Sequence, residues 1–179
     1  TNLISSFYIL NYFPDKKIIL SKDLLDKELT EKIYENNEIF ILCPWDKIGK
    51  FKIDTFFNFH SFMEMNLATR KYYFNLIHDK ISEDGYMLQE NRYCKLVGLE
   101  KNLLREYEYD NKWEKLIYTQ NSENKKLGLV LTKRTIENKK DILNLKKEIQ
   151  LDSKYYEVPN LPVILILIYK FIKSLIIPK

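Results

Sequence analysis

Short apolar runs alternate with segments of helical periodicity along the first half of the chain. The runs, each predicted to be a strand, are residues 17–20, 38–42, 53–60 and 85–90. Between them, apolar residues recur every three or four positions, which predicts helices over residues 3–13, 23–36 and 67–81. Strands separated by single helices favour crossover connections, so the pattern predicts an α/β fold built on a parallel sheet.

Local signals place the ends of these elements. Pro14 ends the first helix, and Ser21 is a suitable N-cap for the next one. Residues 82–85 predict a turn between the third helix and the fourth strand. The run 53–60 contains an isoleucine and three phenylalanines, and we expect it to be a central strand buried on both faces. His78 lies on the polar side of its helix and is expected to be solvated.

The pattern changes after Asn91. Two apolar runs, residues 113–118 and 127–132, flank a polar loop and predict an antiparallel hairpin. A charged helix is expected over residues 136–150. We therefore expect a mixed domain over residues 1–135 and a helical extension over 136–179.

The strongly apolar segment 161–177 is interrupted by Pro162, Lys170 and Lys173. Its apolar part is shorter than the roughly 20 residues that cross a bilayer comfortably. Three interpretations stay open: a helix packed on the domain or on a protein partner, an interfacial membrane helix with snorkelling lysines, and a true span.

Composition narrows the class of protein. Hydrophobic residues make up 45% and charged residues 30% of the 179, which are values of a globular chain. The net charge of +4 suits an anionic partner such as a nucleotide-linked sugar or a membrane surface. No stripe of Arg and Lys with interleaved aromatics is present, so a nucleic-acid partner is not expected.

Cysteine usage and the first residues bear on location. Cys43 and Cys94 form no CxxC pair and no disulfide framework, which favours a reducing, cytoplasmic compartment. No basic leader with a small-residue cleavage site opens the chain. The sequence begins at Thr1 inside a predicted helix, so we expect that an upstream part is missing.

The segment 54–65 carries the residues best suited to chemistry. It is predicted to be a strand that ends in polar side chains and turns directly into a helix, and these side chains are Asn58, His60, Ser61 and Glu64. Ligands of open α/β sheets bind beyond the carboxyl ends of the strands, where these residues are expected. The alternative is structural: a hydrogen-bonded His60 at the helix entry and Ser61 as a cap.

Several motifs resemble one enzyme family. Residues 58–65 read NFHSFMEM, a helix with YYF follows at 72–74, and the next strand ends in ENRY at 90–93. Together with YILNYFP at residues 8–14, they resemble the sugar O-methyltransferases, a family of class I S-adenosylmethionine-dependent enzymes. The resemblance covers roughly residues 3–132.

This resemblance implies a Rossmann-like, mostly parallel sheet that ends in an antiparallel hairpin. It also implies S-adenosylmethionine as cofactor and a sugar, nucleotide-sugar or glycan hydroxyl as acceptor, in bacterial surface polysaccharide biosynthesis. The cofactor contacts would come from Asp23, Asn58 and Ser61. The helix dipole, which favours an Asp in the first turn of a helix, explains Asp23 equally well. Ser21 is a competing candidate for the position of the cofactor-binding acidic residue.

One departure from the family concerns glycine. Class I methyltransferases hold the cofactor on a glycine-rich turn after the first strand, because the backbone approaches the ligand closely there. This chain has four scattered glycines and no such cluster. We expect the first strand and its turn to lie upstream of Thr1.

The chemistry assigns a role to each candidate. Methyl transfer is an in-line displacement, so positioning supplies much of the rate. A sugar hydroxyl is a weak nucleophile, and His60 is the expected general base, with Glu64 one helical turn on to orient it. Asn91 and Arg92 would contact the sugar or its phosphate carrier, unless Arg92 forms a surface ion pair. No carboxylate cluster has metal-ligand spacing, so no metal is expected.

Two other functions compete with this enzyme. If half of the cofactor pocket is absent, the chain would be a truncated, non-catalytic remnant. It could equally be a module that binds a partner through its apolar C-terminal helix. A nucleotide-sugar transferase would need a diphosphate site, and the sequence shows no motif for one.

Overall fold

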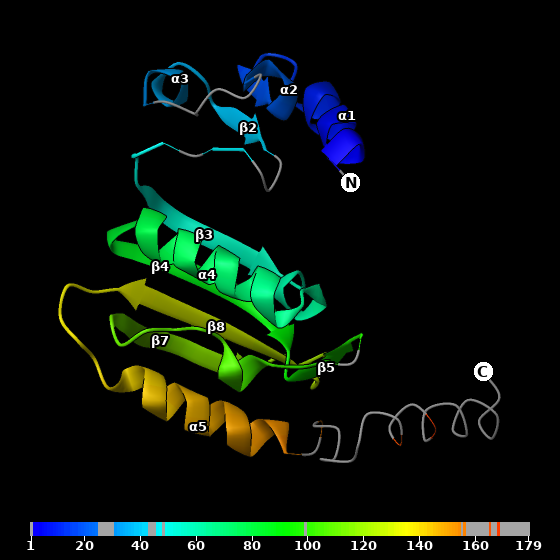
Figure 1. Cartoon of the computed structure of the whole chain (residues 1–179), viewed down its shortest axis with the longest axis vertical. Coiled ribbons are helices and arrows are strands. Elements are labelled where there is room, and N and C mark those ends of the chain that lie inside the picture. Colours follow the sequence, from blue (N-terminus) through cyan, green and yellow to red (C-terminus); the bar gives the residue numbers. More distant parts are fainter. Residues whose placement is uncertain are drawn as a thin grey trace. The chain divides into compact units, whose positions relative to one another are not determined.

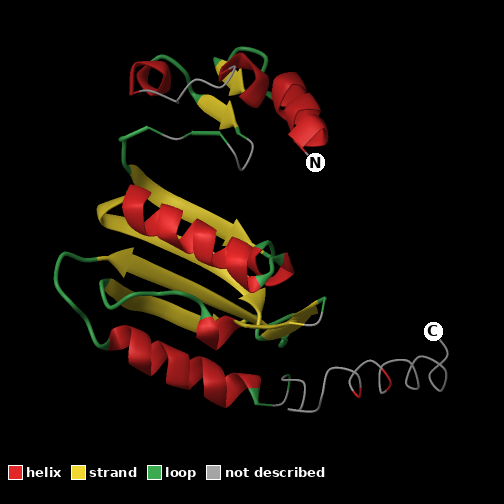
Figure 2. Cartoon of the chain, in the orientation of Figure 1, coloured by secondary structure: helices red, strands yellow, loops and turns green. Residues whose placement is uncertain are grey.

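The computed structural model describes residues 2–24, 31–42, 46–47, 49–98, 100–154, 156, 165 and 168 (Figure 1). The chain divides into two compact units, residues 1–52 and 53–179, which we describe separately. The fold is mixed α/β with both parallel and antiparallel strand pairs (Figure 2). This division falls at a different place from the boundary expected near residue 135.

Unit 1 is small and holds one parallel strand pair. Its elements are α1 (Asn2–Tyr12), β1 (Ile18–Leu20), α2 (Ser21–Leu24), α3 (Glu31–Glu35) and β2 (Ile39–Ile41). The strands β1 and β2 pair in parallel, as predicted. The helix expected over 23–36 appears as α2 and α3, and residues 25–30 lie outside the described part. Ser21 is the first residue of α2 and not its N-cap, and the carboxylate of Asp23 in the first turn reaches back to accept the Leu20 N–H at 2.9 Å.

Unit 2 is built on a four-stranded sheet in the order β3-β4-β8-β7. Its elements are β3 (Ile53–Phe59), the 3-10 turn η1 (Phe62–Glu64), α4 (Leu67–Lys80), β4 (Ile81–Arg92), β5 (Cys94–Val97), β6 (Glu100–Leu103), the 3-10 turn η2 (Leu104–Glu106), β7 (Trp113–Gln120), β8 (Leu127–Arg134) and α5 (Asp141–Ser153). The strands β3 and β4 are parallel, whereas β8 runs antiparallel to both β4 and β7. The predicted terminal hairpin is therefore confirmed.

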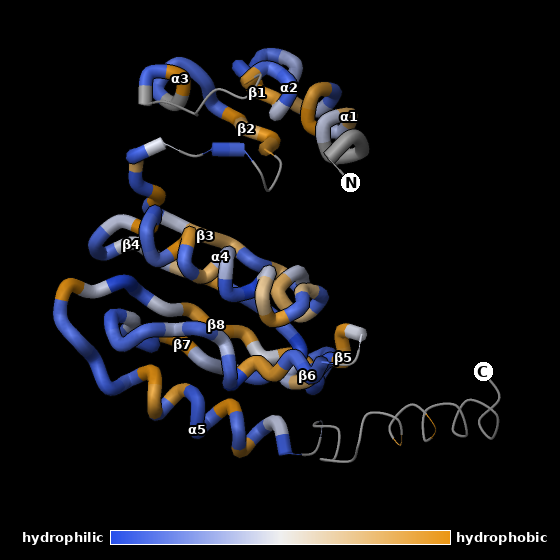
Figure 3. The backbone as a smooth tube through the Cα atoms, in the orientation of Figure 1, coloured by the Kyte–Doolittle hydropathy of each residue, from blue (hydrophilic) through white to orange (hydrophobic). Residues whose placement is uncertain are grey.

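The core lies on one face of this sheet. Phe74 and Ile77 of α4 and Leu145 and Ile149 of α5 belong to one buried cluster with side chains of β4, β7 and β8. Hydrophobic and hydrophilic residues alternate along α5, as expected of a helix with one buried side (Figure 3). Asn66 begins α4 as its N-cap, since its Oδ1 accepts the Thr69 N–H at 2.8 Å.

The predicted turn at residues 82–85 is wrong, because these residues lie inside β4. The strand accommodates them through an irregularity: the register jumps from Ile53↔Ile81 to Thr55↔Tyr86. Asp84 adopts a left-handed φ of 65° in this stretch. The turn-forming residues thus produce a bulge-like distortion and not a chain reversal.

Gly85 is required at this irregularity. A Cβ at position 85 would lie 2.9 Å from Ile81 Cγ1 and 3.0 Å from the carbonyl oxygens of Asp54 and Ser82. Because two of these atoms are backbone, we expect Gly85→Ala to lower the free energy of unfolding by about 1–3 kcal/mol. Urea denaturation of the two proteins measures this difference. An unchanged midpoint and slope would contradict the close packing described here.

The prediction that β3 is buried on both faces is wrong. It is an edge strand of the described four-stranded sheet, and Phe57 and Phe59 are 61% and 54% exposed. Apolar composition alone does not distinguish a central strand from an edge strand with one uncovered face. Among the described residues no helix is long and apolar enough to cross a membrane. Apart from Leu165 and Ile168, the segment 161–177 lies outside the described residues.

His78 is not solvated, contrary to the sequence prediction. Its side chain is 18% exposed and packs against the rings of Phe74 and Trp113, and Nδ1 lies 3.8 Å from Asp110 Oδ2. Its Nε2 is buried without a hydrogen-bond partner in the described structure. Burial lowers the pKa of His78 below its usual 6.5, although nearby Asp110 acts in the opposite direction.

This lowered pKa makes stability depend on pH. The unfolded chain binds a proton at His78 more readily than the folded chain does, so the free energy of unfolding falls as pH decreases below about 6.5. We expect His78→Phe, which cannot titrate, to show a weaker loss of stability between pH 7 and pH 5. Urea titrations at pH 5, 6 and 7 test this, and equal pH slopes for both proteins would refute it.

Candidate functional site

The carboxyl ends of β3 and β4 bring His60 and Glu90 together. The two strands are parallel and pair Phe59 with Glu90, so the residue after β3 lies beside the end of β4. His60 Nε2 is 2.9 Å from Glu90 Oε1, and the His60 backbone N–H donates to the Glu90 carbonyl oxygen at 2.8 Å. The imidazole is therefore fixed both through its ring and through its own backbone.

Asn121 holds the other oxygen of Glu90. Its Nδ2 donates to Glu90 Oε2 at 2.6 Å, while its Oδ1 accepts the backbone N–H groups of Glu123 and Asn124 at 2.9 Å each. The turn between β7 and β8 thus places Asn121 rigidly against the carboxylate. The hydrogen bond from Asn121, together with that from His60, lowers the pKa of Glu90 despite partial burial.

An ionised Glu90 selects one form of the neutral His60 ring. A carboxylate only accepts hydrogen bonds, so His60 Nε2 carries the proton and donates it to Glu90. Nδ1 is then the unprotonated nitrogen, and it makes no hydrogen bond within the described residues. The side chain is 49% exposed, so Nδ1 is available to a ligand as a base.

His60 adopts an unusual backbone conformation. Its φ is 62°, in the left-handed region that non-glycine residues seldom occupy. Residues held in this region cluster at functional sites, because the surrounding structure must compensate for the strain. Here the compensation comes from the hydrogen bonds to Glu90 and from the turn that follows.

That turn, η1, is fixed by two buried amides, Asn58 and Asn91. Asn58 Nδ2 donates to Ser61 Oγ, and its Oδ1 accepts the Phe62 N–H at 3.2 Å. Asn91 Oδ1 accepts the Met63 N–H at 3.2 Å, and its Nδ2 donates to Asn58 Oδ1 at 3.1 Å. Both amides form their hydrogen bonds with other groups of the protein, and these bonds position the turn.

The other predicted site residues have different surroundings in the structure. Glu64 forms an ion pair with Lys95, and the carboxylate that contacts His60 is Glu90. Asp23 belongs to unit 1, where its carboxylate accepts the Leu20 N–H. Arg92 is exposed and lies on the same face of β4 as Glu90, two residues along the strand. Its guanidinium makes no ion pair or hydrogen bond within the described residues.

An exposed aromatic pair lies on the same sheet face. Phe57 and Phe59 stack with ring centroids 6.4 Å apart, and the register places Phe59 next to Glu90. Adjacent uncovered aromatic side chains form a candidate binding surface. Sequence reasoning missed this pair and also missed the roles of Glu90 and Asn121, although the string ENRY at 90–93 had drawn attention to that edge.

Comparisons with known proteins add little to this geometry. No family model matches the chain, and no curated protein matches it. A solved structure of the predicted methylase HI0767 from Haemophilus influenzae is similar over 75% of this chain and 98% of its own, with 8% sequence identity and a TM-score of 0.36. A likeness of this size identifies neither a family nor an activity. Among the described residues, no three His, Cys, Asp or Glu side chains converge as a metal site would require.

Proposed function

We propose that this chain is an S-adenosylmethionine-dependent O-methyltransferase that acts on a sugar hydroxyl in surface polysaccharide biosynthesis. We further propose that the edge formed by His60, Glu90 and Asn121 is its acceptor site. The observation that supports this most directly is an imidazole fixed through Nε2 by an ionised carboxylate, with Nδ1 free. That arrangement is the one a general base requires.

The proposed role of His60 is to take the proton of the acceptor hydroxyl. The hydroxyl donates a hydrogen bond to Nδ1, and the proton moves to Nδ1 as the oxygen becomes a nucleophile. The ring is then an imidazolium, which the Glu90 carboxylate stabilises through the Nε2–H bond. Asn121 keeps Glu90 ionised and oriented throughout.

The sugar part of the proposal is supported by the surroundings of His60. Phe57 and Phe59 offer a flat apolar surface on which the apolar face of a sugar ring can pack. Arg92, with its planar fork of donors, would hold a phosphate carrier or a second hydroxyl. Together these groups suit a polar ring that carries a phosphate better than a purely apolar acceptor.

The described residues do not form a complete site for the methyl donor. The side chains of Asn58 and Asp23 are committed to hydrogen bonds inside the protein, and no glycine lies at the carboxyl end of β3 or β4. The donor remains part of the proposal on the strength of the sequence resemblance.

The direct test is an activity assay on the protein as its gene encodes it. Radiolabelled S-adenosylmethionine is incubated with the protein and a panel of nucleotide sugars and methyl glycosides, and label in the sugar is measured. We expect transfer to at least one sugar. Absence of transfer to every sugar, together with no binding of S-adenosylhomocysteine in calorimetry, would overturn the proposal.

A non-catalytic binding module is the second candidate. The observation in its favour is the same uncovered face, where Phe57 and Phe59 are accompanied by exposed Tyr86 and Ile117. It becomes the better account if neither transfer nor donor binding is found while the protein folds normally.

A further inference from the structure

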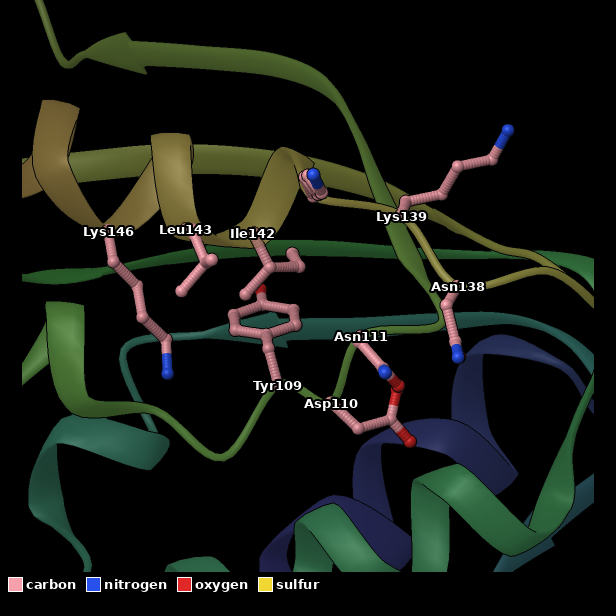
Figure 4. A pocket seen from close by; sticks show the side chains of 9 residues that line it. Tyr109, Asp110, Asn111, Asn138, Lys139, Ile142, Leu143 and Lys146 are labelled. Carbon is pink, nitrogen blue, oxygen red and sulfur yellow. The ribbon is translucent and has the colours of Figure 1, made fainter.

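A hollow lies between the start of α5 and the loop that precedes β7 (Figure 4). Its volume is about 400 Å³. Tyr109, Ile142 and Leu143 supply apolar surface, and the rest of the lining is polar or charged. Figure 4 shows the Tyr109 ring beside Ile142, with Lys146 on one side and Asp110, Asn111 and Asn138 on the other, while the Lys139 side chain extends outward. An apolar surface with a few surrounding polar groups is typical of small-molecule sites.

Positive charge gathers around this hollow. Lys139, Lys140 and Lys146 line it, and within the described residues none of them makes an ion pair. Among the described residues of the lining, Asp110 alone is acidic, and it already accepts hydrogen bonds of 2.5 Å and 3.0 Å from Arg134. Three cations without counterions in one lining attract an anion.

Two amides add hydrogen-bond donors. Asn111 and Asn138 line the hollow, and neither side chain makes a hydrogen bond within the described part of the chain. In Figure 4 their side-chain nitrogens lie on the same side as Asp110. Ammonium and amide donors together suit the several acceptor oxygens of a phosphate group.

The walls of the hollow are held in place. The Lys139 N–H donates to the Asn111 carbonyl oxygen at 2.6 Å, which ties the segment before α5 to the loop before β7. Gln89 Nε2 donates a hydrogen bond of 2.6 Å to the Tyr109 hydroxyl and so fixes the ring. A ligand would therefore meet a largely preformed surface, which lowers the entropic cost of binding.

From these observations we propose that this hollow binds a phosphate-bearing small molecule with a ring, the phosphate near the lysines and the ring on the exposed side chain of Leu143, above the largely buried Tyr109. The site is distinct from the acceptor edge. The pair Trp113↔Arg134 marks the end of the β7–β8 ladder nearest the hollow, whereas Gln120↔Gly128 marks the end next to Asn121. The proposal does not depend on the function proposed for His60.

Calorimetry and amide NMR test this site with two probes, inorganic pyrophosphate and uridine diphosphate. We expect both to bind, uridine diphosphate more tightly because its ring contacts apolar surface. The variant K139Q/K140Q/K146Q should raise the Kd at least tenfold. The control K71Q/K126Q/K147Q removes the same charge from exposed lysines outside the hollow and should leave the Kd within about twofold.

Three results would overturn the site. They are no binding of either probe at millimolar concentration, equal weakening by the two triple variants, and chemical-shift changes that avoid the Asn111 and Asn138 side-chain amides. Shift changes at those two amides that vanish in K139Q/K140Q/K146Q support it. Because these readouts need no turnover, they remain valid whether or not methyl transfer is found.

Discussion

Replacing His60 with Gln lowers the turnover number for methyl transfer by about a hundredfold to ten-thousandfold, because the acceptor hydroxyl loses its general base. The Michaelis constant for the sugar should change much less, since His60 acts mainly in the transition state. The fold should persist, because the side chain is half exposed. The measurement is steady-state transfer of radiolabel from S-adenosylmethionine to the sugar.

Two carboxylates compete for the role of orienting His60. The sequence favoured Glu64, whereas the structure places Glu90 on the ring. We expect Glu90→Gln to lower turnover by at least tenfold and Glu64→Gln to lower it far less. Glu83→Gln, at an exposed position of β4 away from the edge, is the matched control. A larger loss for Glu64→Gln than for Glu90→Gln would restore the original assignment.

The largest effect on stability is expected at Arg70, which is 2% exposed. Its guanidinium binds both oxygens of Glu108, at 2.9 Å and 2.8 Å, and donates to Asn102 Oδ1 at 2.5 Å. It also lies 4.6 Å from the centroid of the Tyr107 ring. Arg70→Met leaves Glu108 and Asn102 without their partner, so we expect a loss of about 3–5 kcal/mol in the free energy of unfolding.

Urea unfolding followed by the fluorescence of Trp113 reports this loss for unit 2, in a Trp45→Phe background. The control is Lys115→Met, which removes a more exposed pair with Glu148, and it should cost no more than about 1 kcal/mol. Arg70→Lys keeps the charge but loses the planar fork and should fall between the two. If Arg70→Met and Lys115→Met cost the same, the buried network is not what stabilises this unit.

Sequence reasoning succeeded where the signal is local. The helical periodicity of residues 67–81 predicts α4, and the polar loop between two apolar runs predicts the hairpin of β7 and β8. Both elements are confirmed. It failed where tertiary context decides. His78 occupies a polar position of its helix, yet Trp113, 35 residues later, covers it.

The candidate site was only partly predictable for the same reason. The position of His60 at the carboxyl end of β3 follows from the place where the apolar run ends in the sequence. The contact of His60 with Glu90 depends on the exact register of β3 and β4, and the contact of Glu90 with Asn121 depends on a hairpin turn 31 residues after Glu90. Neither contact can be predicted from the spacing of the residues along the chain.

The central claim is that Glu90 fixes His60 with its proton on Nε2 and leaves Nδ1 free. Nitrogen-15 NMR of the two histidines at neutral pH measures this directly, since each ring nitrogen has a distinct shift when protonated. We predict the Nε2–H form for His60 in the native protein and a mixture of both forms in Glu90→Gln. A dominant Nδ1–H form, or the same mixture in both proteins, would contradict the account.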